Sequence, residues 1–335
     1  MVKTVKEIVS EIKEIMALRG GLKHVYFVAC GGSKAAIFPG LYLLQSEARS
    51  FGATTYTSNE FVHAVPKELD ERCLAVICSL KATPETVEAV KTANRAGAIT
   101  IAMTGNMETG MAKVGQYVVT YSNGDEQIYS DSNQSNSLRI GFELLHQLEG
   151  WDKYEKAMDA YKYIDDIISE GKEHLLADAR EWAEREKDEP IFYVLASGPN
   201  YGVAYSMCCC HFMEMQWKHA VCLHTGEYFH GPFETTDKEL PMVLLMSEGR
   251  TRALDERCLR FLNTYAKNFI VIDFKELNQG RIDADVAEFF NPVVLIPIER
   301  YYVAQMAEIR GHSMDDRRYM SVSYTHLRAH ETRGN

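Results

Sequence analysis

The sequence lacks several features that would assign it to a common class of protein. No apolar run approaches the roughly 18 residues needed to cross a bilayer. The N-terminal segment carries acidic residues throughout and spaces Val5, Ile8, Ile12 and Ile15 as one apolar helix face, unlike a secretory signal. Acidic residues outnumber basic ones, 47 to 36, which gives a net charge of -11. This charge disfavours nucleic acid as a partner, because binding the phosphate backbone requires clustered Lys and Arg. We therefore expect a cytoplasmic protein that binds a small molecule, with neither a membrane nor a nucleic acid as partner.

Cysteine is present, but without the spacing of a metal site. Three of the eight cysteines, Cys208, Cys209 and Cys210, are adjacent and cannot adopt a C-x-x-C arrangement. In a long chain without a signal, thiols stay reduced. We interpret the three as small core residues, with a redox or metal role as the alternative.

Apolar runs rich in β-branched and aromatic residues recur in two sets with nearly equal spacings. Short buried strands separated by helical segments are typical of βαβ units, so the sequence predicts an α/β fold with two parallel sheets in tandem. Ligands of such sheets bind beyond the carboxyl ends of the strands. The predicted strands are residues 25–30, 74–79, 98–103 and 117–122 in the first set, and 191–196, 242–247, 268–273 and 292–297 in the second.

The same pattern predicts how the chain is divided. A charge-rich, helix-forming stretch separates the two sets of strands and ends at Pro190. The last residues, SVSYTHLRAHETRGN, resemble translated adapter or vector sequence, and we exclude them from fold reasoning. The predicted units are residues 1–150, a connector at 151–189, a second unit at 190–320, and a non-native tail at 321–335.

Two predicted strands of the first sheet are followed by residues suited to binding an anion. After the first strand, Gly31 and Gly32 allow a tight turn and Ser33 opens a helix, whose free N–H groups favour an anion. After the second, Ser79, Lys81 and Thr83 precede another helix start. The alternative is ordinary turn formation and helix capping by Ser33 and Thr83. Capping leaves Ser79 and Lys81 unexplained, so we favour a phosphate site.

In the second half, one acid stands in a long apolar stretch. Glu214 lies in a helix that is apolar nearly all round, so its carboxylate must be paired or have a pKa raised by desolvation, as a general base requires. The alternative is an ion pair with Lys218, four residues on. The loop HTGEYFHGP then supplies Glu227 and His230, where an imidazole can reach a ligand or simply be solvated. Arg250 and Arg252, after the predicted strand at 242–247, can likewise pair with a substrate carboxylate or lie on the surface.

Together these residues resemble a known family. The Cys30-Gly31-Gly32-Ser33 turn, the Ser79 to Thr83 loop, and Glu214 followed by the His230 of His-Gly-Pro resemble the tandem sugar isomerase (SIS) fold, of doubly wound, flavodoxin-like architecture. Within it, HVYFVACGGSKAA and MEMQWKHAVCLHTGEYFHGPFE are similar to the bacterial deglycases of fructoselysine and fructose-asparagine 6-phosphates, which are related to the isomerase half of glucosamine-6-phosphate synthase.

The resemblance implies an activity and a role for each residue. It implies cleavage of a 6-phosphorylated Amadori compound with water, without a metal or organic cofactor, in a homodimer whose sites are shared between subunits. Glu214 is then the general base, His230 the general acid, and Glu227 a candidate substrate contact. The implied phosphate-binding residues are Gly31, Gly32, Ser33, Ser79, Lys81 and Thr83.

The chain departs from the family pattern at the phosphate loop, and other functions stay open. The loop SLKAT lacks the family's glycine and is one residue shorter. One alternative function is aldose–ketose isomerisation of a sugar phosphate, and another is a non-catalytic sugar-phosphate regulator, which has no need of Glu214 together with His230. Amide-dependent amination of a sugar phosphate is disfavoured, because synthases of that kind carry an N-terminal glutaminase domain with a catalytic cysteine. Here the first cysteine, Cys30, lies inside the first predicted sheet.

Overall fold

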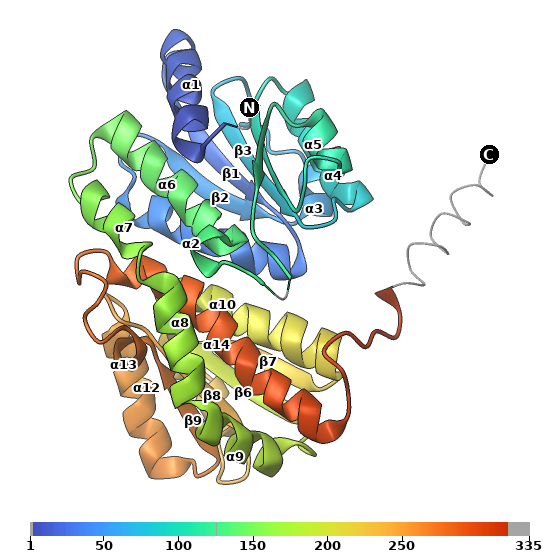
Figure 1. Ribbon diagram of the computed structural model, residues 1–335, viewed down its shortest axis with the longest axis vertical. Helices are drawn as coiled ribbons and strands as arrows, with labels where there is room; N and C mark the ends of the chain where they lie inside the picture. Colours follow the sequence, from blue (N-terminus) through green and yellow to red (C-terminus); the bar gives the residue numbers. More distant parts are fainter. Residues whose placement is uncertain (1–2, 125, 321–335) are drawn as a thin grey trace, which may run out of the picture.

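The computed structural model describes residues 3–124 and 126–320 and contains two parallel sheets, one in each half of the chain (Figure 1). Neighbouring strands are parallel throughout, in the orders β2-β1-β3-β4-β5 and β7-β6-β8-β9. The predicted α/β class with two parallel sheets is confirmed. The strands are β1 (His24–Val28), β2 (Gly52–Tyr56), β3 (Cys73–Ser79), β4 (Ile99–Thr104), β5 (Tyr117–Thr120), β6 (Ile191–Ala196), β7 (His219–His224), β8 (Met242–Met246) and β9 (Phe269–Asp273).

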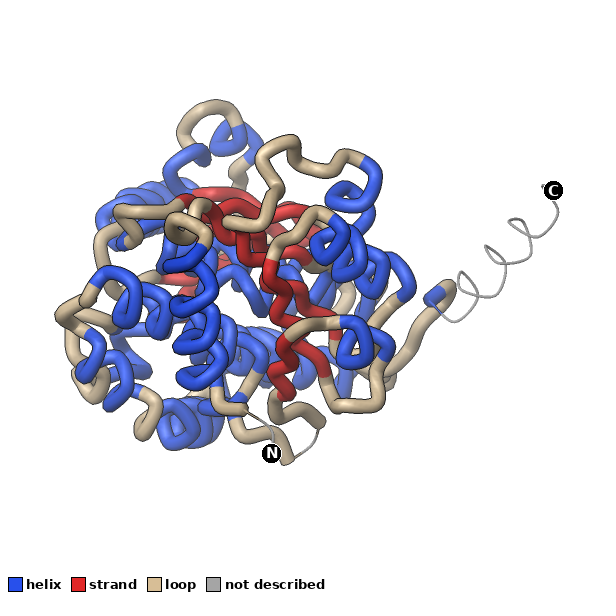
Figure 2. Tube along the Cα trace, turned by 90° about the horizontal axis from the view of Figure 1, so that it is seen from above, coloured by secondary structure: helices blue, strands red, loops and turns tan. Residues whose placement is uncertain are grey.

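Helices cover both faces of the sheets, which lie inside the molecule (Figure 2). In β1, Val25 and Phe27 pack into one apolar cluster, whereas Tyr26 and Val28 pack into another on the opposite face. This two-sided burial explains why these strands are continuous apolar runs. The helices of the first half are α1 (Val5–Leu18), α2 (Gly31–Glu47), α3 (Ser58–His63), α4 (Pro84–Arg95), α5 (Gly110–Val114), η1 (Tyr129–Asp131) and α6 (Asn133–Glu149).

The rest of the chain is also rich in helices. The segment predicted as a connector forms α7 to α9. Within the residues described, every helix is too short or too polar to cross a bilayer. These helices are α7 (Tyr154–Ala160), α8 (Ile164–His174), α9 (Leu176–Glu186), η2 (Gly198–Asn200), α10 (Tyr201–Tyr205), η3 (Ser206–Met215), α11 (Thr225–Tyr228), η4 (Pro232–Thr235), α12 (Arg252–Tyr265), α13 (Phe274–Asn278) and α14 (Ala287–Arg310).

One predicted strand is wrong and two strands were missed. The run at 292–297 lies inside α14, which is buried on nearly all sides, and a short apolar run cannot distinguish a buried helix from a buried strand. The missed strands, β2 and β7, are edge strands that are partly exposed: β2 (GATTY) lacks a continuous apolar run, and the run in β7 (HAVCLH) is only four residues long between two histidines. The predicted tail at 321–335 lies outside the described residues.

The two halves share one core. The apolar cluster that contains Val25 of β1 also contains Phe192 of β6, and α14 packs on α2 and α6 of the first half as well as on α8, α9 and α10. Arg250, after β8, reaches across to Glu47 of α2 at 3.0 Å. The start of α2, just after β1, also lies against the second half, because α2 packs on η2 and η3 and Gly32 faces Cys210.

Candidate functional site

The first part of the site is a pair of helix N-termini without side-chain caps. In the first half, α1, α3, α5 and α6 are each capped by a Thr or Ser hydroxyl, but α2 and α4 are not. These two helices follow β1 and β3, which are neighbours in the sheet. Their first-turn N–H groups carry the partial positive charge that binds anions. Gly31, with φ of +54°, starts α2, and Ser33 lies half-buried in its first turn.

Hydroxyl groups connect the start of α4 to the end of β3. The buried Ser79 accepts the backbone N–H of Thr83 at 3.3 Å, while the Thr83 hydroxyl is bonded to that of Thr86 at 2.8 Å. Thr83 therefore does not cap α4, which contradicts the alternative of ordinary capping. Lys81 is exposed in this loop. Ala82 has φ of +52°, so an alanine adopts the conformation that favours glycine in the shortened loop.

The second part of the site is η3, a π-helix that passes close to the start of α2. A Cβ atom at Gly32 would lie 3.8 Å from the sulfur of Cys210. Burial, and after it the neighbouring Glu214 carboxylate, raises the pKa of the Cys210 thiol. Glu214 follows Cys210 by four residues, about one turn of such a helix. The structure thus brings the helix that carries Glu214 beside the Gly31 to Ser33 turn.

The Glu214 carboxylate is paired, but not with the predicted residue. Nε of Arg317 donates to its Oε1 at 2.9 Å, and 27% of the Glu214 side chain stays exposed in the single chain. Of the two alternatives for this carboxylate, pairing and desolvation, the structure shows pairing. The alternative pair with Lys218 is also wrong, because the buried Lys218 ammonium instead donates to the Glu189 carbonyl. Desolvation, and then repulsion by Arg310, lowers the pKa of Lys218 to about 8.

The loop with Glu227 and His230 lies at the other end of β7. Glu214 precedes this strand and the loop follows it, and six residues of strand span about 17–20 Å. Both Glu227 and His230 are exposed, and the His230 N–H donates to the Glu227 carbonyl at 2.8 Å. Within one chain, therefore, Glu214 and His230 do not meet.

The predicted core role of the adjacent cysteines agrees with their burial. Cys208 and Cys210 are buried and Cys209 is half-buried. All eight cysteines of the chain lie within the described residues, and all carry free thiols.

Several polar residues around η3 were missed by sequence reasoning. His211 Nδ1 lies 2.7 Å from Oε2 of the fully buried Glu299, and burial raises the pKa of that carboxyl. Trp217, with φ of +55°, follows η3 and packs against the ring of His312. These partners are far apart in sequence, so no local spacing could have revealed them.

The arginine suggested as a carboxylate partner is occupied within the chain. Arg250 pairs with Glu47 and with Glu288. Arg252, considered together with it, forms two parallel bonds with Asp273, at 2.9 and 2.7 Å. Both guanidiniums are therefore engaged within the chain, although 54% of the Arg250 side chain is exposed.

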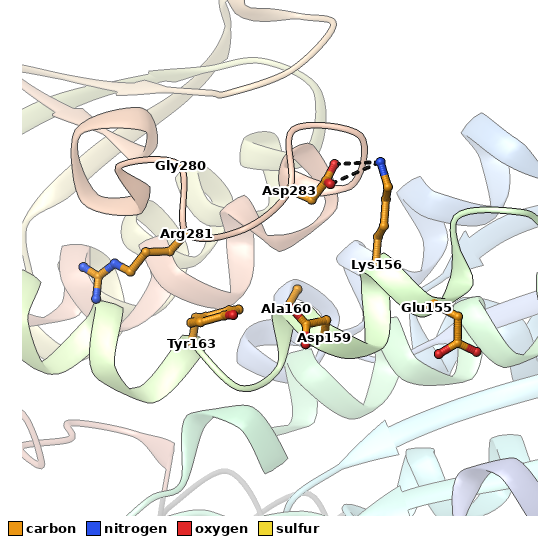
Figure 3. Close-up of a pocket in the computed structure, with 8 residues that line it drawn as sticks. All are labelled: Glu155, Lys156, Asp159, Ala160, Tyr163, Gly280, Arg281 and Asp283. Atoms are coloured by element: carbon orange, nitrogen blue, oxygen red, sulfur yellow. Dashed lines mark hydrogen bonds and ion pairs between the residues drawn. The ribbon is translucent and has the colours of Figure 1, made fainter.

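A separate cavity of about 440 Å³ contains none of the predicted site residues. It lies between α7, the start of α8 and the loop after α13, where Lys156 pairs with Asp283 (Figure 3). Arg281, at its other side, pairs with Glu170 at 2.9 Å. Lys156 and Asp283 pair with each other, whereas Asp159 and Arg281 pair with Lys162 and Glu170, which do not line the cavity, so its position does not alter the assignment above. The lining residues are Glu155, Lys156, Asp159, Ala160, Tyr163, Gly280, Arg281 and Asp283.

Known proteins resemble the chain over nearly its whole length. Fructosamine deglycase FrlB of Bacillus subtilis (strain 168) is 39% identical over 314 residues, covering 92% of this chain and 96% of that protein. Fructoselysine 6-phosphate deglycase of Escherichia coli (strain K12) is 24% identical over 315 residues, covering 93% and 89%. A crystal structure described as that of a phosphosugar isomerase from Bacillus subtilis has a TM-score of 0.91 at 38% identity, covering 95% and 96%. No protein-family model matches the chain.

The relationship to FrlB and the shared fold agree with the resemblance carried by the Gly31 to Ser33 turn, Glu214 and His230. The chain therefore belongs to the SIS-domain sugar-phosphate deglycase family and is an enzyme of that kind.

Proposed function

We propose that this enzyme cleaves a fructose-amino acid 6-phosphate, an Amadori compound, with water to glucose 6-phosphate and the free amino acid. The observation that carries the proposal is the position of Glu214, on a helix that passes beside the uncapped N-terminus of α2. A carboxylate close to an anion site is the arrangement needed to move a proton on a bound sugar phosphate.

The phosphate binds at the starts of α2 and α4. Backbone N–H groups of Gly31, Gly32 and Ser33 donate to it from α2, and the hydroxyls of Ser79 and Thr83 donate from the neighbouring loop. Lys81, exposed in that loop, adds a positive charge.

The chemistry requires one proton to move between adjacent carbons. Glu214 removes a proton from C1, which bears the amine; the C1–H electron pair forms the C1=C2 bond of an enolamine, and the C2=O π pair moves to oxygen, which takes a proton. Protonation at C2 then gives an iminium between C1 and nitrogen. Water adds to C1; the new C1 hydroxyl loses its proton to form the aldehyde of glucose 6-phosphate, and the C1–N bond breaks as nitrogen takes a proton, releasing the amino acid. Arg317 holds Oε1 of Glu214, which leaves Oε2 for the proton transfer.

The general acid comes from a second copy of the chain. Glu214 and His230 lie at opposite ends of β7 in one chain, so a homodimer with sites shared between subunits accounts for both residues. In this arrangement the partner subunit's His230 protonates substrate oxygen, and Glu227 of the same loop contacts the substrate.

A product assay tests the proposal. The purified enzyme is incubated with fructoselysine 6-phosphate, fructose-asparagine 6-phosphate and their unphosphorylated forms, and glucose 6-phosphate release is followed. We expect release from a phosphorylated conjugate only. Interconversion of fructose 6-phosphate and glucose 6-phosphate, without cleavage of any conjugate, would contradict the proposal and favour an isomerase.

A further inference from the structure

A group of arginines surrounds the end of η3, and the reaction described so far uses only Arg317. Nη1 of Arg310 donates to the Gln216 carbonyl at 3.0 Å, and Nη1 of Arg300 lies 3.3 Å from the sulfur of Met215. Arg317 pairs with the Glu214 carboxylate, whereas a cation here without such a partner would suit an anionic group of a substrate.

One of these cations differs from the others. The guanidinium of Arg318 lies over the ring of Trp217, 4.0 Å from the ring centroid, and its side chain is exposed. Within residues 3–124 and 126–320, Arg318 forms no ion pair, and the nearby Asp316 carboxylate instead accepts the Ser313 N–H at 3.0 Å. Stacking fixes the plane of the guanidinium and leaves its N–H edge for a planar anion.

Trp217 is itself held in an unusual conformation. Its φ of +55° is costly for a bulky residue, and its ring packs edge-on against His312 with centroids 4.3 Å apart. Trp217 follows Glu214 by three residues, so the indole and the guanidinium above it keep a fixed position relative to that carboxylate.

We propose that Arg318, stacked on Trp217, binds the α-carboxylate of the amino acid carried by the sugar. This inference rests on the proposed function, in which Glu214 acts at C1. In a conjugate joined through the α-amine of its amino acid, the carboxylate carbon is three bonds from C1, about 3–4 Å away. Arg317 and Arg318 are consecutive, with Cα atoms about 3.8 Å apart, and their side chains reach Glu214 and Trp217 respectively. The preferred substrate class is thus conjugates joined through the α-amine of an amino acid, which the enzyme should cleave more efficiently than conjugates of simple amines.

The test compares two substrates in two proteins. Wild type and Arg318→Met are assayed with fructose-asparagine 6-phosphate, joined through the α-amine, and with the matching 6-phosphate conjugate of 3-aminopropanamide, which lacks only the α-carboxylate. We expect Arg318→Met to lower kcat/KM for the asparagine conjugate by about 10- to 100-fold, the cost of one hydrogen bond between charged groups, and to leave kcat/KM for the 3-aminopropanamide conjugate within about two-fold. Arg318→Lys keeps the charge without the planar fork, so its loss should be intermediate.

The outcomes separate this inference from the proposed function. If wild type cleaves neither conjugate, the proposed function fails. If Arg318→Met lowers kcat/KM for both conjugates by the same factor, or for neither, the carboxylate subsite is overturned and Arg318 has only a structural role. If Arg318→Met weakens glucose 6-phosphate binding to the same extent as it lowers kcat/KM, the arginine binds phosphate, which also overturns the inference.

Discussion

Arg317 and Glu214, 103 residues apart in sequence, form an ion pair at 2.9 Å between Nε and Oε1. Arg317 is itself anchored, since its Nη1 donates to the carbonyls of Met314 and Asp316 at 2.9 and 2.8 Å. The segment after α14 thus fixes one oxygen of the proposed base and leaves the other for the substrate.

Glu214→Gln should remove turnover without removing substrate binding. The amide keeps the size of the side chain but cannot accept a proton from C1, so we expect kcat to fall by about 10²- to 10⁴-fold. Glucose 6-phosphate binding, measured by calorimetry, should stay within about three-fold because its phosphate contacts lie on α2 and α4. Near-normal kcat in this variant would show that another group moves the proton.

Arg317→Met should lower kcat with little change in KM. The methionine fills similar space but no longer holds Oε1 of Glu214, so the carboxylate loses its fixed orientation, and we expect a loss of about 10-fold in kcat. Arg281→Met is the matched control, because Arg281 pairs with Glu170 in the separate cavity. Its kcat should equal that of wild type, and equal losses in the two variants would argue against a positioning role.

Ala82→Gly should stabilise the protein. The φ of +52° at Ala82 costs about 1–2 kcal/mol for a residue with a Cβ atom, and the greater freedom of glycine in the unfolded chain offsets about 0.4–1 kcal/mol of the gain. We therefore expect urea unfolding to show an increase of up to about 1.6 kcal/mol in the free energy of unfolding. Ala82→Val should be destabilised, because a β-branched residue is strained further there. A loss of stability in the glycine variant would contradict this explanation of the shortened loop.

Lys218 should make stability depend on pH in the alkaline range. Its pKa of about 8 in the folded protein lies below the value of about 10.4 in an unfolded chain. Between these values the unfolded state binds more protons, so the free energy of unfolding should rise as the pH increases. The penalty for burying the charged ammonium is complete below pH ~8, amounts to about 3 kcal/mol, and is relieved by pH ~10.4.

Lys218→Met tests this dependence. The variant should be more stable than wild type at neutral pH, by less than about 3 kcal/mol since it also loses the bond to the Glu189 carbonyl. The advantage should shrink as the pH rises in urea unfolding experiments. Lys13→Met, at an exposed site on α1, serves as control and should follow wild type. An advantage that does not vary with pH would contradict the linkage.

The sequence predicted the parts of this fold that depend on local pattern. β1, β3, β6 and β8 are buried on both faces, so their apolar runs stood out and located the loops that follow them. The run at 292–297 was wrongly predicted as a strand, because a helix buried on nearly all sides has as apolar a sequence as a buried strand.

The candidate site was only partly predictable for a similar reason. The Gly31 to Ser33 turn and the Ser79 to Thr83 loop follow from local chemistry, because glycine and hydroxyl residues stand at helix starts. The partner of Glu214 does not follow from local sequence. Lys218 has the favourable spacing for an ion pair but is buried and donates to the Glu189 carbonyl, whereas Arg317, 103 residues away in sequence, pairs with Glu214. Tertiary contacts decided which cation meets the carboxylate.

Mixing two inactive variants tests most directly the claim that Glu214 and the partner subunit's His230 act on the same substrate. Glu214→Gln and His230→Ala proteins are unfolded together, refolded as a 1:1 mixture, and assayed for glucose 6-phosphate release. Each mixed dimer would contain one site with both residues intact, so the account predicts recovery of about a quarter of wild-type activity. A mixture as inactive as its two components, with mixed dimers present, would contradict it.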